Sequence, residues 1–237
     1  MYATHPVPDG LVLLDASETP APSASVLERV EALWAETQAR TPGLFNGSLF
    51  SLAAFDGARA LGFMAQYKWY VAQLAEPSLF EALRVRSLAV SGLVNVRGHL
   101  VFGKRRAGLS LEGGLWELAP SGTLSDASRE PDGSLSWRGQ FARELTEELG
   151  LSAPLGALKA FALVEDTATN IWELGVSAEL DLDPGDVLAA YAGLERTEHD
   201  QLSIVPLADV PRFHKTRRKE LTGVTGPLLA AAGYIKS

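Results

Sequence analysis

The sequence predicts an α/β fold, in which a mixed sheet lies between layers of helices and is preceded by a small α+β segment. Strand-like apolar runs alternate with helical patterns along the 237 residues, and 46% of the residues are hydrophobic, which is ample for a core. Alternating helices and strands usually pack as layers around one sheet. We therefore expect an α/β/α sandwich at residues 86–237 and an accessory α+β subdomain at residues 1–85.

The N-terminal region is expected to supply the elements of the accessory subdomain. These are a strand at 11–14, a helix at 25–40, strands at 44–52 and 60–67, and a partly helical segment at 67–83. Thr41, Pro42 and Gly43 should end the helix, because proline cannot continue it and glycine suits a helix end. Asn46-Gly47 is a strong turn signal and should lead into the first strand of a pair.

The main domain is expected to contain most of the strands. Strands are predicted at 87–94, 100–103, 115–118, 158–165, 171–182 and 202–207, and helices at 187–193 and 214–233. A further helix near the middle of the chain carries the most informative pattern. Ahead of it, Asp132-Gly133 predicts a tight turn within an inserted loop or small hairpin.

The stretch 143–151 reads Arg-Glu-Leu-Thr-Glu-Glu-Leu-Gly-Leu. On a helix, Glu144 lies one turn from both Glu147 and Glu148, whereas the apolar residues form a neighbouring ridge that can face a core. Like charges at these spacings repel by about 0.2–0.5 kcal/mol per pair, and a hard divalent cation would remove that cost. A solvated acidic face is the alternative for an arbitrary run of glutamates.

The nine residues 143–151 match the second half of the Nudix box, Arg-Glu-apolar-x-Glu-Glu-x-Gly-apolar, so the chain resembles the Nudix hydrolase superfamily. The first half of the box is interrupted, because Leu135 stands eight residues before the match, where the family has a glutamate. An insertion would explain this. Residues 116–122 resemble the family's Trp-Glu-x-Pro-Gly-Gly approach to the box. Gly122 would then be its first glycine, with the upstream glutamate either absent or supplied by Glu130.

The resemblance implies the Nudix fold over residues 87–235 and hydrolysis of a diphosphate bond in a nucleoside diphosphate linked to another moiety. Glu144, Glu147 and Glu148 would be metal ligands, with Glu148 the first choice for the essential residue. The cofactor would be Mg²⁺, with Mn²⁺ as a substitute. Such ions neutralise a diphosphate, orient it and lower the pKa of a bound water.

Three further residues are candidates for catalysis or substrate binding. Glu198 lies in a loop that resembles the glutamate-rich approach to a late strand of the family, so it would be a fourth ligand or a base, with an exposed acidic loop as the alternative. Arg105 and Arg106 follow a strand that should lie beside the box, and a guanidinium fork suits phosphate oxygens. A solvated turn is the other interpretation of these arginines. His199 is expected at the surface, with a substrate contact as the alternative.

Residues 44–52 carry a second resemblance. Their sequence, Leu-Phe-Asn-Gly-Ser-Leu-Phe-Ser-Leu, is similar to a run that precedes the box in a Nudix branch with UDP-glucose diphosphatases among its members. A nucleotide sugar such as UDP-glucose is therefore one expected substrate. An ordinary hairpin in an accessory subdomain is the alternative interpretation of the same residues.

Charge and composition limit the expected partners. The formal net charge of −8, from 29 acidic and 21 basic residues, disfavours binding to nucleic acid. No apolar run is long enough to cross a membrane and the N-terminal residues do not resemble a signal peptide, so we expect a cytoplasmic protein. Without cysteine, any metal must bind to oxygen or histidine. The oligomeric state is left open, with a homodimer among the options.

Two other functions stay open at this stage. The interrupted box favours a Nudix-fold nucleotide-binding or regulatory module that is catalytically weak or inactive. An accessory protein that acts through a partner is the remaining alternative. The fold alone does not decide among them, because the same fold hosts many functions and specificity resides in loops.

Overall fold

The computed structural model describes residues 1–41, 43–195 and 197–236, and it confirms the α/β class. Its strands are β1 (Tyr2–Pro6), β2 (Val12–Asp15), β3 (Ser48–Phe55), β4 (Arg59–Gln66), β5 (Ser87–Val96), β6 (His99–Arg105), β7 (Trp116–Leu118), β8 (Ser121–Thr123), β9 (Ser134–Leu135), β10 (Lys159–Asp166), β11 (Ile171–Leu180) and β12 (His199–Pro206). Its helices are α1 (Ala24–Arg40), α2 (Tyr67–Ala75), α3 (Phe80–Leu83), α4 (Trp137–Leu149), α5 (Pro184–Ala192), α6 (Val210–Arg217) and α7 (Thr225–Ala231). Pro42, expected to help end the first helix, lies outside the described residues. None of the described helices is long and apolar enough to span a membrane.

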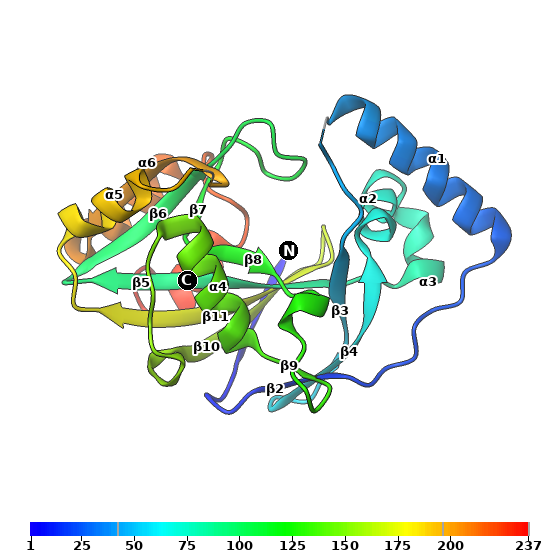
Figure 1. Ribbon diagram of the computed structural model, residues 1–237, viewed down its shortest axis with the longest axis horizontal. Coiled ribbons are helices and arrows are strands. Elements are labelled where there is room, and N and C mark those ends of the chain that lie inside the picture. The colour runs from blue at the N-terminus through cyan, green and yellow to red at the C-terminus, as the bar shows by residue number, and fades with distance from the viewer. Residues whose placement is uncertain (42, 196, 237) are drawn as a thin grey trace.

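The strands form one connected mixed sheet, with β5 at its centre (Figure 1). β11 runs parallel to β5, from the pair Ile171↔Ser87 to the pair Leu180↔Val96. β10 and then β1 continue the sheet beyond β11, each antiparallel to its neighbour. On the other side, β6 pairs with β5, β7 and β12, and β8 pairs with β5. The short strands β7 and β8 therefore bring residues 116–123 to the middle of the sheet.

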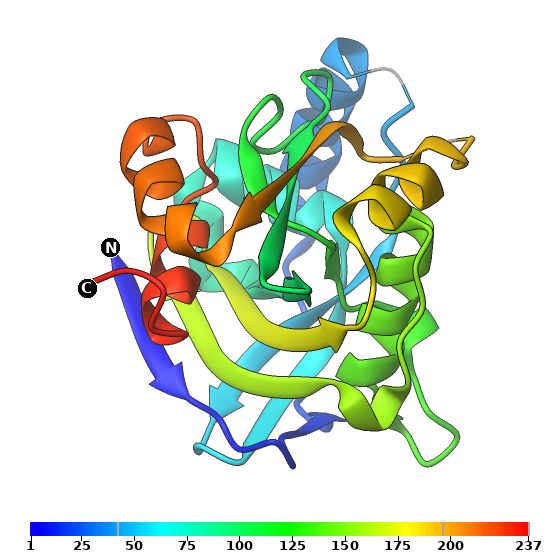
Figure 2. The ribbon, with the colours of Figure 1, turned by 90° about the vertical axis from the view of Figure 1, so that its left-hand side faces the viewer.

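Helices cover both faces of this sheet, as the predicted α/β/α arrangement requires. Leu88, Val90 and Val94 of β5 pack in one core with residues of α4 and α5, whereas Leu93 packs in a second core with residues of α6 and α7. Successive side chains of a strand point to opposite faces, so the two cores lie on opposite sides of β5. Figure 2 shows α4 and α5 on one side of the strands and α6 and α7 on the other.

Residues between 26 and 85 build most of a third core. α1, α2 and α3 lie beside β3 and β4 (Figure 1), and Trp69 and Tyr70 are buried between these elements. Among the described residues, β3 meets β5 at a single register pair, Ser51↔Ser87. β1 instead pairs with β10 and so extends the C-terminal part of the sheet. The division into an accessory subdomain and a main domain stays a prediction.

Helix α4 is fixed at both ends and along one face. The Ser136 hydroxyl accepts a hydrogen bond from the backbone N–H of Gly139 at 3.0 Å and caps the first turn. Gly150 has a φ of 67°, the left-handed conformation that commonly ends a helix. Phe141 and Leu145 are fully buried, as the apolar ridge predicts. Because this packing fixes which face of α4 lies against the core, it also fixes the directions in which the glutamates leave the helix.

The segment ahead of α4 forms the predicted turn at Asp132-Gly133. Asp132 Oδ1 accepts a hydrogen bond from the Ser134 backbone N–H at 2.9 Å, and Gly133 has a φ of 86°. The following strand, β9, pairs with β2 through Leu13↔Leu135. Leu135, which stands where the family pattern has a glutamate, is thus a buried strand residue.

The prediction of one helix at 214–233 is wrong, because the structure has two helices, α6 and α7, and between them a non-helical segment in which Leu221 forms a β-bridge with Trp116. In that segment the Trp116 N–H donates to the Glu220 carbonyl at 2.7 Å, and the Thr222 N–H donates to the Trp116 carbonyl at 2.8 Å. Residues 220–222 thus form hydrogen bonds with the backbone N–H and C=O groups of Trp116 at the free edge of β7. A long-range contact of this kind overrides the local helical pattern.

Candidate active site

The three glutamates of α4 occupy different environments. Glu148 is buried, with 2% of its surface exposed. Glu144 is partly buried, and Glu147 is exposed. Helix α4 therefore directs the carboxylates of Glu144 and Glu148 toward the interior beside β8, whereas the Glu147 carboxylate is exposed.

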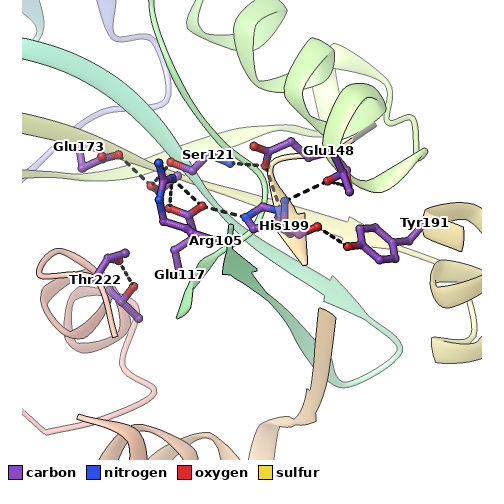
Figure 3. A network of polar contacts seen from close by, with 11 residues as sticks. Arg105, Glu117, Ser121, Glu148, Glu173, Tyr191, His199 and Thr222 are labelled. Carbon is purple, nitrogen blue, oxygen red and sulfur yellow. Dashed lines mark hydrogen bonds and ion pairs between the residues drawn. The ribbon is translucent and has the colours of Figure 1, made fainter. Parts of the chain in front are cut away.

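One carboxylate oxygen of Glu148 is hydrogen-bonded, and the other has no hydrogen-bond partner among the described residues. Its Oε2 accepts a hydrogen bond from the Ser121 backbone N–H at 3.0 Å, as Figure 3 shows. No described residue hydrogen-bonds to the buried Oε1. Burial, followed by repulsion from Glu117 and Glu144, raises the pKa of Glu148 well above its usual value. A buried carboxylate with an unpartnered oxygen is costly unless a cation or proton compensates it.

Glu144 lies against Gly122 of β8. A β-carbon built on Gly122 would be 2.0 Å from Glu144 Oε1, so the Glu144 side chain occupies the space that glycine leaves open there. The Gln140 amide donates to Glu144 Oε1 at 2.5 Å. Burial, with added repulsion from Glu147 and Glu198, raises the pKa of Glu144 to about 7. Gly122, which the sequence analysis expects to be the first glycine of the box, thus lies beside the glutamate helix.

A buried polar network that the sequence analysis missed lies directly beside Glu148 (Figure 3). His199 is not at the surface as expected: 1% of it is exposed, and its Nε2 lies 2.8 Å from Glu117 Oε1. The Arg105 Nη1 donates to both oxygens of Glu117 at 2.8 and 2.9 Å. The imidazole Nδ1 of His199 lies 3.8 Å from Glu148 Oε2.

The sequence predicts a strand at Glu117 but places His199 in the acidic loop ahead of the strand predicted at 202–207. Glutamate and histidine side chains in such a loop are usually exposed, so the sequence carries no clear signal for this network. Burial becomes understandable only from the pairing of β12 with β6, where Gly103 leaves the space that the His199 ring fills.

The remaining predicted residues lie around this network. Arg105 is directed inward by its ion pair with Glu117, and 17% of its side chain is exposed. Arg106 is exposed, 3.9 Å from the nearest carboxylate oxygen of Asp200. Glu198 is exposed, and its carbonyl accepts the Arg106 N–H at 2.9 Å. Of this group, Arg106 and Glu198 are accessible to a ligand and Arg105 is engaged by the protein. Arg196, two residues before Glu198 in the sequence, lies outside the described residues.

A second buried carboxylate, Glu173 of β11, connects to the site through two serines. The Ser91 hydroxyl donates to Glu173 Oε2 at 2.8 Å and lies 3.3 Å from the Ser121 hydroxyl. Burial raises the pKa of Glu173 to about 8. The backbone of Ser121 in turn holds Glu148, so the chain of contacts runs from β11 across β5 to α4. Glu173 was not among the predicted site residues.

The donor atoms suit a hard divalent cation in type. Glu144 and Glu148 offer carboxylate oxygens, one of them buried and unpartnered, and such oxygens are the ligands that Mg²⁺ prefers. Within residues 1–41, 43–195 and 197–236, no three histidine, aspartate or glutamate side chains are grouped closely enough to hold a metal. The exposure of Glu147 agrees with this, because its carboxylate does not join those of Glu144 and Glu148 in a group of three.

The comparisons with known proteins identify structural similarity rather than sequence relatives. No protein-family profile and no curated protein match the sequence. The NUDIX domain of Shewanella oneidensis NrtR, solved with ADP-ribose, is 17% identical, with 64% of this chain and 89% of that chain covered and a TM-score of 0.46. The Deinococcus radiodurans protein DR0079 is 12% identical, with 76% and 96% covered and a TM-score of 0.49.

A third similar structure is the bifunctional NMN adenylyltransferase/ADP-ribose pyrophosphatase of Francisella tularensis, solved with AMP and a manganese ion. It is 16% identical, with 68% of this chain and 45% of that chain covered and a TM-score of 0.46. The resemblance of residues 143–151 to the Nudix box therefore rests on the sequence itself.

Proposed function

We propose that the protein is a Mg²⁺-dependent hydrolase that cleaves the diphosphate bond of a nucleoside diphosphate linked to another moiety. One observation carries the proposal: the buried Glu148 has an unpartnered oxygen and lies on the same helix as Glu144, within the nine-residue match to the Nudix box. Two neighbouring carboxylates with raised pKa values repel each other, and a bound cation would remove that repulsion.

In this proposal Glu144, Glu147 and Glu148 hold the ion, with Mn²⁺ able to replace Mg²⁺. Bound Mg²⁺ would neutralise diphosphate oxygens and lower the pKa of a water. The Ser121 N–H fixes one oxygen of Glu148 and leaves the other free to act as a ligand. Glu147, which is exposed, would complete the ligand set by a rotamer change at the rim of the site.

Substrate contacts in the proposal come from the accessible side chains around the helix. Glu198 is exposed and would act as a further ligand or as the base that takes a proton from the attacking water. Arg106 is exposed and would bind phosphate oxygens. Arg105, given the same role in the sequence analysis, would act indirectly, because Glu117 engages it.

The proposed substrate class is a nucleotide sugar such as UDP-glucose or a related nucleoside-diphosphate derivative. Residues 44–52 support the nucleotide sugar through their resemblance to the UDP-glucose diphosphatase branch. ADP-ribose, which the Shewanella domain binds, belongs to the same chemical class. Every member of the class presents a diphosphate between a nucleoside and a second group, so one assay can compare them.

The test is release of nucleoside monophosphate from a panel that contains UDP-glucose, GDP-mannose and ADP-ribose, with Mg²⁺ or with EDTA. We expect Mg²⁺-dependent release from at least one compound and its loss in Glu148→Gln. Glu36→Gln, an exposed glutamate on α1, is the matched control and should behave as wild type. No release from any compound, or unchanged release by Glu148→Gln, would remove the proposal.

A nucleotide-binding module without turnover is the second candidate. It is favoured by the exposed Glu147 and by Leu135, which is buried where the family pattern has a glutamate. Isothermal titration calorimetry with the same panel separates the two functions. Saturable binding by a protein that releases no monophosphate would support the module instead of the enzyme.

A further inference from the structure

The imidazole of His199 is enclosed on every side. A β-carbon on Gly103, in the neighbouring strand β6, would lie 2.4 Å from the ring atom Cδ2, so the ring occupies the space over this glycine. The backbone beside the ring is also fixed, because the Tyr191 hydroxyl donates to the His199 carbonyl at 2.7 Å. The ring is therefore packed tightly between β6 and the interior, and its backbone is held in place.

The ring presents a different nitrogen to each of two carboxylates. Nε2 lies 2.8 Å from Glu117 Oε1, and Arg105 holds Glu117 in place from the other side. Nδ1 faces the opposite way, 3.8 Å from Glu148 Oε2, and has no hydrogen-bond partner among the described residues. Figure 3 shows the four side chains following one another from Arg105 to Glu148.

A polar nitrogen that is buried without a partner carries a free-energy cost, so its retention beside a functional carboxylate calls for an explanation. Groups behind a metal ligand commonly set the orientation of that ligand and are fixed in turn by their own hydrogen bonds. His199 has both features: one nitrogen is fixed by Glu117, and the other faces the carboxylate that the proposed function requires.

We propose that His199 is a positioning residue, and that its Nδ1 side restrains the Glu148 carboxylate in the orientation in which it binds a divalent cation. The Ser121 N–H restrains Glu148 Oε2 from the strand side, and the His199 ring limits its movement from the β12 side. Glu117 and Arg105 act behind the ring by holding it. This inference rests on the proposed function, since it assumes that Glu148 is a ligand.

Two substitutions separate the two nitrogens. A glutamine amide reaches about as far as Nε2 and an asparagine amide about as far as Nδ1, so His199→Gln keeps a donor to Glu117 and His199→Asn keeps a polar atom facing Glu148. The readouts are the dissociation constant of Mn²⁺ alone, measured by electron paramagnetic resonance without substrate, and the Tm of the metal-free protein. The matched control is His99→Gln. His99 is the first residue of β6, whereas His199 lies beside the last residues of that strand.

We expect His199→Gln to keep most of the Tm and to bind Mn²⁺ about 10–100-fold more weakly, the usual effect of removing a group behind a metal ligand. His199→Asn should show the reverse order, with a lower Tm and an affinity near that of wild type. If His199 only fills space, the Tm and the Mn²⁺ affinity should both depend on the contact with Glu117. Glutamine should then be the better replacement in each assay. Wild-type Mn²⁺ affinity in a folded His199→Gln protein would overturn the inference, even if the asparagine variant does not fold.

Glu148→Gln, measured in the same assay, distinguishes failure of this inference from failure of the proposed function. If Glu148→Gln binds Mn²⁺ weakly and His199→Gln binds it as wild type does, the positioning role is wrong and the proposed ligand stands. If Glu148→Gln binds Mn²⁺ as wild type does, Glu148 is not a ligand, and the inference and the proposed function are both overturned.

Discussion

Gly122 and Glu144 lie so close that a β-carbon on Gly122 would be 2.0 Å from Glu144 Oε1. The contact joins β8 to the first of the three helix glutamates. Gly122 does not have a positive φ, so the reason for glycine is the missing side chain rather than an unusual backbone conformation. The space that this glycine leaves sets the position of a candidate metal ligand.

Gly122→Ala should therefore impair the site more than the fold. The new methyl group meets the end of a flexible side chain, and Glu144 can swing away at a cost in stability of about 1 kcal/mol or less. The displaced carboxylate would no longer share an ion with Glu148, so Mn²⁺ affinity and any Mg²⁺-dependent hydrolysis should fall at least tenfold. Denaturant unfolding and Mn²⁺ titration measure the two effects separately.

Gly156→Ala is the control, because a β-carbon there would have no atom within 4 Å and the residue has no positive φ. It should match wild type in both assays. Unchanged Mn²⁺ affinity in Gly122→Ala would show that the position of Glu144 does not matter for binding an ion.

Glu173 makes stability depend on pH. Burial raises its pKa to about 8 from the ordinary value of 4.5, so the folded state binds the proton more tightly than the unfolded state. The stabilisation is complete below about pH 4.5 and is lost as pH rises toward 8, on the order of a few kcal/mol at about 1.4 kcal/mol per pKa unit. Glu173→Gln should then be more stable than wild type at pH 8.5 and similar to it at pH 5.

Urea unfolding at several pH values measures this difference. Glu179→Gln, an exposed glutamate on the same strand, should leave the pH dependence of wild type unchanged. Parallel stability curves for wild type and Glu173→Gln between pH 5 and pH 8.5 would contradict a buried, proton-holding carboxyl group at this position.

The raised pKa of Glu144, about 7, should make ion binding stronger as pH rises, whereas the stabilisation from Glu173 becomes weaker. A metal ligand must lose its proton, so Mg²⁺ competes with the proton until the pH exceeds the pKa. The affinity for Mg²⁺ should therefore rise between pH 6 and pH 8. Calorimetric titration at each pH measures the rise, which Glu144→Gln should flatten.

The two adjacent arginines should respond differently to substitution. Arg105→Gln leaves the buried Glu117 without its cation and should lower the free energy of unfolding by about 3–5 kcal/mol. Arg106→Gln removes an exposed side chain and should change stability by no more than about 0.5 kcal/mol. If Arg106 binds phosphate, its loss raises KM several-fold. Steady-state kinetics on the folded variant would decide this, and an unchanged KM would exclude Arg106 from the substrate site.

Much of the arrangement around α4 was predictable because it is local in sequence. The positions of Phe141 and Leu145 follow from helical spacing, the end at Gly150 follows from the conformational freedom of glycine, and the turn at Asp132-Gly133 follows from its sequence. Each of these features depends on residues within one or two turns of one another. Periodicity and turn preferences describe such features well.

The rest depends on contacts between distant segments. The break between α6 and α7 exists because the edge of β7 accepts residues 220–222, and nothing in those residues indicates it. The burial of His199 depends on Gly103, in the neighbouring strand β6. Glu173 reaches the site only because β11 lies parallel to β5. None of these relationships leaves a periodic pattern in the sequence.

The most direct test of the account is a crystal structure of the protein soaked in Mn²⁺, with anomalous scattering used to place the ion. The account predicts an anomalous peak within coordination distance of carboxylate oxygens of both Glu144 and Glu148, with Glu147 turned toward the same ion. A fully soaked crystal with no peak at α4, and with these oxygens in solvent or bound to arginine, would contradict it.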